Sequence, residues 1–457
     1  MTPASDTNIV VLMTDQHRID TLGCYGNQVC QTPAIDGLAA RGVRFANAFT
    51  PTAICTPSRA SLLTGVLPFR HGLLANHERN VGYREELDER YPTFAGPLRS
   101  SGYQAGHVGK WHAGARLGPA EHGFDGTDYP GWGNPVRHPD YLAYLAERTI
   151  ERLRGYAEAY HREGRPFYLA CDWFGPHLPY CLPESYYRRY DPATVELPAS
   201  LAETFDSKPM VQRHYSEHWA FDTLSLDQWR ELTAAYWGYV TLIDEQVGRI
   251  LAALEELDLA GRTMVAFTAD HGEFTGSHRL HDKGPAMYDD IYRIPLVIAG
   301  PGMRAGVVEE RFATLMDLTP TMLDVAGTEV PEYYDGSSLV PLLRGEPAPG
   351  WRDTVVAEFH GHHFPYPQRM LRTSRYKLVI NPGDRNELYD LVADPDELHN
   401  RYLHPELREV RDQLMRDLYQ QLQDRGDNFY HWMTSMFDVG GADYDVTLAS
   451  FETQGAQ

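Results

Sequence analysis

The sequence lacks the features that mark membrane proteins and disulfide-rich secreted proteins. No stretch reaches the roughly 18 consecutive apolar residues of a membrane helix, and the start lacks the basic segment and long apolar core of a signal peptide. The five cysteines are odd in number and form no C-x-x-C motif, which argues against a disulfide framework. We therefore expect a cytoplasmic protein with no membrane partner.

Positive charge is also scarce. The 63 acidic residues outnumber the 41 basic residues and give a formal net charge of -22. This balance argues against nucleic acid as a partner, because a nucleic-acid-binding protein needs a positive field. An anionic ligand would have to bind in a pocket that is basic only locally. The length of 457 residues suits one large domain and a smaller one.

Several short apolar runs end in polar residues that could carry chemistry. The runs cover residues 9–13, 166–170, 263–267 and 294–298. Continuous apolar runs are typical of strands buried on both faces of a parallel sheet. Helical patterns, such as residues 33–40 and 226–257, lie between them. We therefore predict an α/β fold, with a large, doubly wound and mainly parallel sheet flanked by helices.

The same fold predicts where a site would lie. In such sheets, ligands bind at the carboxyl ends of the strands. Asp15, His177 and the pair Asp270 and His271 all follow apolar runs. We therefore expect these side chains to share one site.

The C-terminal part has a different character. Short strands are predicted at 354–359, 370–373, 376–380 and 387–391, followed by an amphipathic helix at 404–424 and an aromatic tail. We predict a main α/β domain over 1–345 and a smaller α+β subdomain over 346–457, with an antiparallel sheet and a closing helix. The tail could also join subunits into a homodimer or homotetramer.

The most informative stretch runs from Cys55 to Gly65 and reads CTPSRASLLTG. Pro57 suits the first turn of a helix and Gly65 suits its end. Cys55 would then face the positive end of the helix dipole, which favours an anion there, such as a thiolate or a bound sulfate. Arg59 lies one turn further on, and its planar guanidinium matches an oxyanion. A structural cysteine at a helix start is the alternative interpretation.

This stretch resembles the signature of the type I sulfatases of the alkaline phosphatase superfamily, which is C-x-P-S-R followed by L-T-G. The resemblance implies that a maturation enzyme oxidises Cys55 to formylglycine. The hydrated aldehyde would attack sulfur with one hydroxyl and expel sulfate with the other.

A second stretch, GYQAGHVGKWH at residues 102–112, is similar to the family's glycine-rich strand that ends in G-K-W-H. Ala105 stands where serine or threonine is more usual. Lys110 and His112 are two apart, so on an extended strand they would leave by the same face. The resemblance implies that Lys110 steadies the formylglycine oxygen. It also implies that His112 takes a proton during elimination, as an imidazole can near neutral pH.

Asp15-Gln16 and Asp270-His271 form two pairs suited to a divalent metal ion, with the modified Cys55 as a further ligand. Carboxylate and amide oxygens favour Ca²⁺ or Mg²⁺, and the His271 nitrogen shifts the preference towards Mn²⁺. Many sulfatases carry Asp-Asp and Asp-Asn at these places and bind calcium. The Gln and His found here resemble the phosphonate monoester hydrolase and choline sulfatase branches. We expect one ion, Ca²⁺ or Mn²⁺.

The resemblance assigns two further site residues. His177 would contact the sulfate and help the leaving oxygen, and Lys283 would hold a sulfate oxygen. Asn76 and His77 are further candidates to line the pocket. His278 and His281 have no assigned role, and the histidines of residues 360–363 are interpreted as a substrate-pocket loop or plain surface before a second metal site.

The predicted reaction is hydrolysis of a small aryl, alkyl or carbohydrate sulfate ester. Hydrolysis of phosphonate monoesters or phosphodiesters is the closest rival, although Lys110 and His112 favour the sulfatase. A binding protein without catalysis is a third possibility, and it requires that Cys55 stay a thiol. Aromatic residues and histidines between Tyr129 and Tyr215 are consistent with stacking on a sugar or aryl group, and equally with packing.

Overall fold

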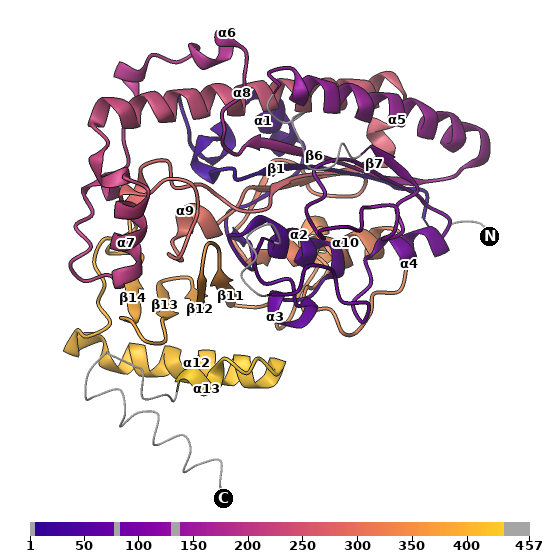
Figure 1. Ribbon diagram of the computed structural model, residues 1–457. Coiled ribbons are helices and arrows are strands. Elements are labelled where there is room, and N and C mark those ends of the chain that lie inside the picture. Colours follow the sequence, from indigo (N-terminus) through magenta and orange to yellow (C-terminus); the bar gives the residue numbers. More distant parts are fainter. Residues whose placement is uncertain (1–4, 77–82, 129–137, 434–457) are drawn as a thin grey trace, which may run out of the picture.

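The computed structural model describes residues 5–76, 83–128 and 138–433 (Figure 1). At its centre lies an eight-stranded sheet with the order β5-β4-β6-β1-β7-β8-β2-β9. The strands from β5 to β7 are parallel, β8 is antiparallel to both β7 and β2, and β9 is parallel to β2. The strand bounds are β1 Asn8–Asp15, β2 Val43–Phe45, β4 Gln104–Gly109, β5 Gly126–Asp128, β6 Phe167–Pro176, β7 Thr263–Ala269, β8 Leu296–Ala299 and β9 Val307–Glu309.

Helices cover both faces of this sheet (Figure 1). One layer contains α1 (Pro33–Ala40), α5 (Tyr141–Glu163) and α8 (Leu226–Glu256). The other contains α2 (Cys55–Thr64), α3 (Pro68–His71), α4 (Ala95–Ser100), α10 (Leu318–Val325) and α11 (Val340–Arg344). Successive residues of β1 enter opposite cores, so the strand is buried on both faces. The predicted doubly wound, mainly parallel sheet is thereby confirmed.

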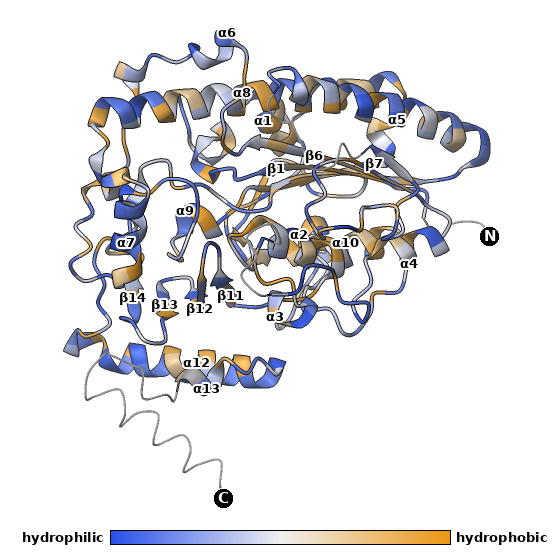
Figure 2. Cartoon of the chain, in the orientation of Figure 1, coloured by the Kyte–Doolittle hydropathy of each residue, from blue (hydrophilic) through white to orange (hydrophobic). Residues whose placement is uncertain are grey.

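Local sequence explains the longest helix. α8 begins with a capping box, in which the Ser225 hydroxyl accepts a hydrogen bond from the backbone of Gln228, and the Gln228 side chain accepts one from the backbone of Ser225. The helix predicted at 226–257 is confirmed to within one residue. Figure 2 shows hydrophobic residues concentrated on the central strands. Within the described residues, no helix is both long and apolar enough to cross a membrane.

The run predicted as a strand at 294–298 forms β8, which is antiparallel to β7. Its carboxyl end therefore lies at the opposite edge of the sheet from the ends of β1, β6 and β7. An apolar run carries no information about strand direction, so the sequence could not separate this strand from the others.

The C-terminal part forms the predicted antiparallel sheet, in the order β11 (Thr354–Gly361), β12 (Pro365–Thr373), β13 (Tyr376–Ile380), β14 (Glu387–Asp390). One face packs against the α/β part, and the other packs against α12 (Arg408–Arg425). The boundary at 345/346 stays a prediction. The aromatic tail lies outside the described residues from 434 onwards.

The remaining elements are short. β3 (Ala48–Phe49) and β10 (Ala313–Thr314) form a two-stranded parallel sheet. The remaining α-helices are α6 (Glu184–Tyr187), α7 (Met210–His218), α9 (Asp289–Tyr292) and α13 (Tyr430–Met433). The 3-10 helices are Ile19–Thr21, Gly23–Tyr25, Pro192–Thr194, Ala199–Ala202, Phe221–Thr223, Ala260–Arg262, Ser277–Arg279, Leu315–Asp317 and Pro405–Leu407.

Candidate active site

Cys55 is the first residue of α2, and the whole helix is buried. The residue before it, Ile54, offers no side-chain cap. Instead, the Asn76 carboxamide oxygen accepts a hydrogen bond of 3.0 Å from the Thr56 backbone nitrogen. The helix ends at Gly65, whose φ is 70°, as the sequence predicted. Asn76 therefore caps the helix start, while His77 lies outside the described residues.

The ends of strands β1 and β7 meet at the Cys55 thiol. The Cys55 sulfur lies 3.2 Å from His271 Nε2 and 3.6 Å from Asp15 Oδ1. Ligand atoms of Asp15, Cys55, Asp270 and His271 all lie within 4.8 Å of one another, and all four residues are buried. The predicted convergence of these residues is therefore present in the fold.

His271 presents one defined nitrogen to this cluster. Its Nδ1 lies 2.8 Å from the carbonyl oxygen of Gly272, so Nδ1 carries the proton and donates it there. Nε2 then faces the cluster with its lone pair. Burial lowers the pKa of His271, which keeps the imidazole neutral. Two carboxylates and a neutral, oriented imidazole fit a divalent cation.

Arg59 joins the two carboxylates of the cluster. Its Nε donates to Asp270 Oδ2 over 2.9 Å and one terminal nitrogen donates to Asp15 Oδ2 over 3.2 Å. The other terminal nitrogen donates to the Lys110 carbonyl oxygen over 3.0 Å. Burial alone would raise the pKa of Asp15, but Lys110, His177 and Arg59 hold it well below its usual range. Both carboxylates are thus fixed in place by one planar cation.

Lys110 reaches the site, although not from an extended strand. β4 ends at Gly109, which has a φ of 99°. A Cβ added at this position would lie only 2.1 Å from the Asp172 carbonyl oxygen, so only glycine fits here. His112 has a left-handed backbone with a φ of 50°. The predicted same-face geometry on a strand is therefore wrong. Lys110 Nζ nevertheless forms an ion pair with Asp15 Oδ2, and both Lys110 and His112 are buried.

Lys283 and His177 form a second hydrogen-bonded group at the site. Lys283 Nζ lies 2.7 Å from Gln16 Oε1, 3.0 Å from His177 Nε2 and 3.0 Å from Asp282 Oδ1. Gln16 is thereby held by Lys283, and its amide nitrogen contacts Glu273. The ligand role predicted for Gln16 stays a prediction. Lys283 is only 1% exposed, so it is not a solvated surface lysine.

His177 accepts a hydrogen bond in this arrangement. Its Nδ1 lies 2.5 Å from the Leu178 carbonyl oxygen and donates to it, which leaves Nε2 to accept from Lys283. Burial and the Lys283 charge lower the pKa of His177 to about 3. The free protein therefore holds His177 neutral.

Cys55 is a neutral thiol before any modification. Burial, followed by the Asp15 carboxylate, raises the pKa of Cys55 to about 12, despite Lys110 and Lys283. Of the two anions suggested for the helix start, the thiolate is therefore disfavoured, because desolvation outweighs the helix dipole here, while the bound sulfate stays a prediction.

Two site residues were missed by the sequence reasoning. Asp172 is buried in β6, its carbonyl oxygen accepts from the Lys110 backbone nitrogen over 2.8 Å, and burial raises its pKa to about 7. Glu273 contacts Gln16 and lies 3.2 Å from His281 Nδ1. Asp172 interrupts the apolar strand β6, and Glu273 follows the apolar strand β7. An acidic residue at such a buried position is the sequence signal that could have identified both.

The other histidines have separate environments. His278 stacks on Tyr288 at 3.5 Å and its Nδ1 lies 3.2 Å from Glu203 Oε2. His360 Nε2 lies 2.7 Å from Glu358 Oε2. His363 lines a pocket, and the substrate-pocket role suggested for residues 360–363 stays a prediction.

Comparison with known proteins gives consistent matches over nearly the whole chain. The family model described as Sulfatase matches residues 7–328, and the model of the C-terminal part of N-sulphoglucosamine sulphohydrolase matches residues 276–424. The uncharacterized sulfatase YidJ of Escherichia coli is 30% identical, over 93% of this chain and 89% of its own.

Two further similar proteins are a sulfatase and a phosphonate monoester hydrolase. The N-acetylglucosamine-6-O-sulfatase of Bacteroides thetaiotaomicron is 27% identical, over 92% of this chain and 87% of its own. The phosphonate monoester hydrolase of Agrobacterium radiobacter has a similar structure, with a TM-score of 0.76 and 24% identity over 92% of this chain and 96% of its own.

Proposed function

This chain belongs to the sulfatase family of the alkaline phosphatase superfamily, and on that premise we propose that it hydrolyses carbohydrate sulfate esters with a formylglycine made from Cys55. As a family member it is a sulfuric ester hydrolase. The observation that carries the proposal is the cluster of Asp15, Cys55, Asp270 and His271, with ligand atoms within 4.8 Å at the start of a buried helix.

The nucleophile requires a modification before the first turnover. A maturation enzyme breaks the Cβ–Sγ bond of Cys55 and forms a C=O bond, with water as the formal source of oxygen. The sulfur leaves as sulfide, and two electrons and two protons pass to the oxidant of that enzyme. Hydration of the aldehyde then gives a geminal diol at the helix start, where the unmodified thiol is too buried to ionise.

The surrounding residues have separate roles in sulfuryl transfer. One diol hydroxyl forms a bond to sulfur while the ester S–O bond breaks, and Asp15 Oδ1, 3.6 Å from the Cys55 sulfur, is placed to take the hydroxyl proton. Lys283 breaks its hydrogen bonds to His177 and Gln16, and its ammonium group then holds a sulfate oxygen. His177 is neutral in the free protein, so its Nε2, no longer bonded to Lys283, takes up a proton as the sulfate ester enters and then passes that proton to the leaving alcohol oxygen. A leaving alkoxide needs this proton, because alcohols are weak acids.

The second half of the reaction restores the aldehyde. His112 removes the proton of the remaining hydroxyl, the C=O bond forms again, and the C–O bond to sulfate breaks. Lys110 and Arg59 keep positive charge beside Asp15 throughout.

Asp15, Asp270, His271 and the modified Cys55 would hold one divalent ion, and Gln16 is a further candidate ligand. Such an ion would neutralise negative charge on the transferring group and acidify a bound hydroxyl. The imidazole ligand favours Mn²⁺ more than an all-oxygen site would, while Ca²⁺ stays the alternative.

A carbohydrate substrate is supported by the N-acetylglucosamine-6-O-sulfatase relative. The alternative is hydrolysis of phosphonate monoesters, which the structural similarity to a phosphonate monoester hydrolase favours. Sulfate and phosphonate monoesters share a tetrahedral shape and metal needs. Values of kcat/KM for matched aryl sulfate, phosphate monoester and phosphonate monoester therefore separate the two, and we expect the sulfate to be hydrolysed fastest.

The formylglycine proposal is tested by mass spectrometry of the tryptic peptide 45–59, using protein from a host that contains the maturation enzyme. We expect a peptide in which an aldehyde oxygen replaces the sulfur. A fully alkylatable Cys55 in that material would refute the proposal. Protein from a host without the maturation enzyme is the control, and there the thiol is expected.

Assembly through the aromatic C-terminal tail stays a separate prediction, which sedimentation analysis of the full chain can test.

A further inference from the structure

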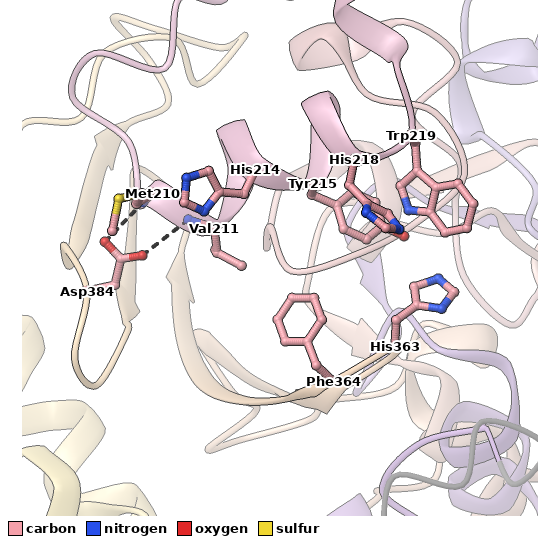
Figure 3. Close-up of a pocket in the computed structure, with 9 residues that line it drawn as sticks. All are labelled: Met210, Val211, His214, Tyr215, His218, Trp219, His363, Phe364 and Asp384. Atoms are coloured by element: carbon pink, nitrogen blue, oxygen red, sulfur yellow. Dashed lines mark hydrogen bonds between the residues drawn. The ribbon is translucent and has the colours of Figure 1, made fainter.

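A large pocket lies between helix α7 and the β11–β12 connection, next to the residues described above (Figure 3). Its volume is about 620 Å³, which is within the range of small-molecule sites. The lining residues are Met210, Val211, His214, Tyr215, His218, Trp219, His363, Phe364 and Asp384. This pocket has no part in the reaction steps above.

The pocket combines aromatic faces with polar edges. Trp219 is 44% exposed and Phe364 is 40% exposed, so large apolar side chains are presented to solvent here. The rings of Trp219 and His363 lie 5.2 Å apart, and those of His218 and Trp219 lie 5.0 Å apart. Figure 3 shows the α7 side chains facing His363 and Phe364 across the pocket. Ring faces beside imidazole donors and acceptors match a ligand with an apolar face and a hydroxylated edge.

The charge of the lining limits the ligand further. Among the described residues that line the pocket there is no lysine or arginine, and Asp384 contributes a carboxylate. A carboxylated or sulfated ring would gain no ion pair with a lining lysine or arginine and would meet this acid. An aryl group would offer no hydroxyl to the imidazoles of the lining. An uncharged sugar ring satisfies both the aromatic faces and the imidazoles.

The walls are held in place without a ligand. Asp384 accepts hydrogen bonds from the backbone nitrogens of Met210 at 3.0 Å and Val211 at 3.3 Å, which fixes the start of α7 (Figure 3). Gln212 is bonded to Glu387 over 3.1 Å and to the Tyr288 hydroxyl over 2.7 Å. α7 is therefore bonded to the C-terminal sheet on which the opposite wall lies, and a preformed pocket lowers the entropic cost of binding.

One residue connects the pocket with the reaction site. The Tyr215 hydroxyl donates to the Lys283 carbonyl oxygen over 2.7 Å, while Lys283 Nζ lies 3.0 Å from His177. A Cβ on Gly284 would come within 2.8 Å of the Tyr215 ring, so the two segments are in close contact. The pocket wall thus contacts the segment that carries the proposed sulfate-binding lysine.

We infer that this pocket binds an uncharged sugar ring of the substrate, next to the ring that carries the sulfate. This inference rests on the proposed function and specifies the substrate as a saccharide sulfated on one ring and neutral on the other. Trp219 provides the stacking face, and His363 provides a hydrogen-bonding partner.

The test is a binding measurement, so it does not depend on turnover. Full-length protein with Cys55→Ala is titrated calorimetrically with inorganic sulfate, with lactose and cellobiose each sulfated at a single hydroxyl, and with a sulfated disaccharide that carries a uronate. We expect sulfated lactose or sulfated cellobiose to bind ten times more tightly than inorganic sulfate and than the uronate compound. Trp219→Ala and His363→Ala should each weaken that binding at least tenfold.

Tyr187→Ala is the matched control, because Tyr187 is 50% exposed and outside the pocket. It should leave the dissociation constant unchanged. The inference is overturned if neither sulfated lactose nor sulfated cellobiose binds more tightly than inorganic sulfate, or if the uronate compound binds more tightly than both. It is also overturned if Trp219→Ala, like Tyr187→Ala, leaves the dissociation constant unchanged. A failure of formylglycine formation would appear only in the peptide analysis, so the two proposals fail separately.

Discussion

Arg59 and the carboxylates of Asp15 and Asp270 form a buried unit beneath Cys55. Three nitrogens of one planar guanidinium are used, two on the carboxylates and one on the Lys110 carbonyl oxygen. A lysine in this place would keep the charge but would offer one donor group on a flexible stem. Arginine is therefore required by geometry as well as by charge.

Arg59→Lys should reduce kcat by about 100-fold to 1,000-fold, the range seen when one preorganised hydrogen-bond donor is lost. The physical cause is that Asp15 and Asp270 are no longer held at fixed positions around the nucleophile. Steady-state kinetics on an aryl sulfate, with the fraction of converted Cys55 measured for each protein, give the effect. Arg41→Lys is the matched control, since Arg41 forms only an exposed ion pair with Glu255. A kcat for Arg59→Lys within tenfold of the wild type would contradict this assignment.

Metal removal should abolish activity at the same site. We expect chelation to lower kcat/KM at least 100-fold and a divalent ion to restore it, because two carboxylates and a neutral imidazole converge there. Metal analysis of the purified protein identifies the ion. In the His271→Asn variant an oxygen ligand replaces the imidazole, so its relative affinity should shift from Mn²⁺ towards Ca²⁺. Full activity in the chelated protein, with no bound metal, would refute the site.

Among the elements, strand β11 shows how the C-terminal sheet attaches to the nucleophile layer. Its buried residue Glu358 accepts a hydrogen bond of 3.1 Å from the Phe69 backbone nitrogen in α3, and it lies 2.7 Å from His360 Nε2. Arg369 of β12 pairs with Asp427, just beyond α12, over 2.6 Å. Burial, with a further contribution from Asp427, raises the pKa of Glu358 to about 8, although Arg369 opposes this.

This raised pKa predicts a pH-dependent stability. The folded protein keeps the Glu358 proton up to about pH 8, whereas the unfolded chain loses it near 4.5. The stabilisation from this group is therefore complete below 4.5 and is lost as the pH rises, at about 1.4 kcal/mol per pH unit. Glu358→Gln cannot ionise, so its stability relative to the wild type should rise from pH 5 to pH 8 and then level off.

Denaturant unfolding at several pH values measures this difference. Glu346→Gln, at an exposed position, removes a carboxylate without burial and should give a flat difference. A flat difference for Glu358→Gln as well would mean that Glu358 is ionised in the folded protein throughout this range.

At the scale of the whole molecule, the two parts of the chain share a core. One buried cluster contains Phe49, Ile54 and Tyr288 from the α/β part together with Phe359 and Met370 from the C-terminal sheet. Buried charges also cross between the parts. Lys377 Nζ lies 2.5 Å from Asp289 Oδ1 and 2.6 Å from Glu397 Oε1, and Arg372 lies 3.2 Å from Asp289 Oδ2.

Residues 1–345 expressed alone should therefore fail to form a stable domain. Removal of the C-terminal part would expose the shared apolar cluster and leave Asp289 without both of its basic partners, and loss of one partner from a buried pair costs about 3–5 kcal/mol. Calorimetry and solubility compare this fragment with the full chain, which should unfold in a single transition. A soluble fragment with the melting temperature of the full chain would show that the two parts are independent domains.

Much of the fold could be predicted because it depends on local pattern. Buried apolar runs specified β1, β6 and β7, the 3.6-residue spacing specified α8, and Pro57 and Gly65 specified the extent of α2. The direction of β8 could not be predicted, because an apolar run is compatible with a parallel or an antiparallel neighbour. The backbone of His112 was missed for a similar reason, since its left-handed φ is imposed by the surrounding fold.

The residue types and their spacing alone identified the nucleophile helix and most of the acids, bases and cations around it, although not Asp172 and Glu273. Only the tertiary structure decided what each of these groups does before substrate arrives: Cys55 stays protonated, His177 accepts from Lys283, and Gln16 faces Lys283 and Glu273. The reason is physical. A side chain keeps its donors, acceptors and ionisable groups wherever it lies in the fold. Its desolvation and its electrostatic interactions depend instead on its neighbours, and several of these are more than 200 residues away in the sequence.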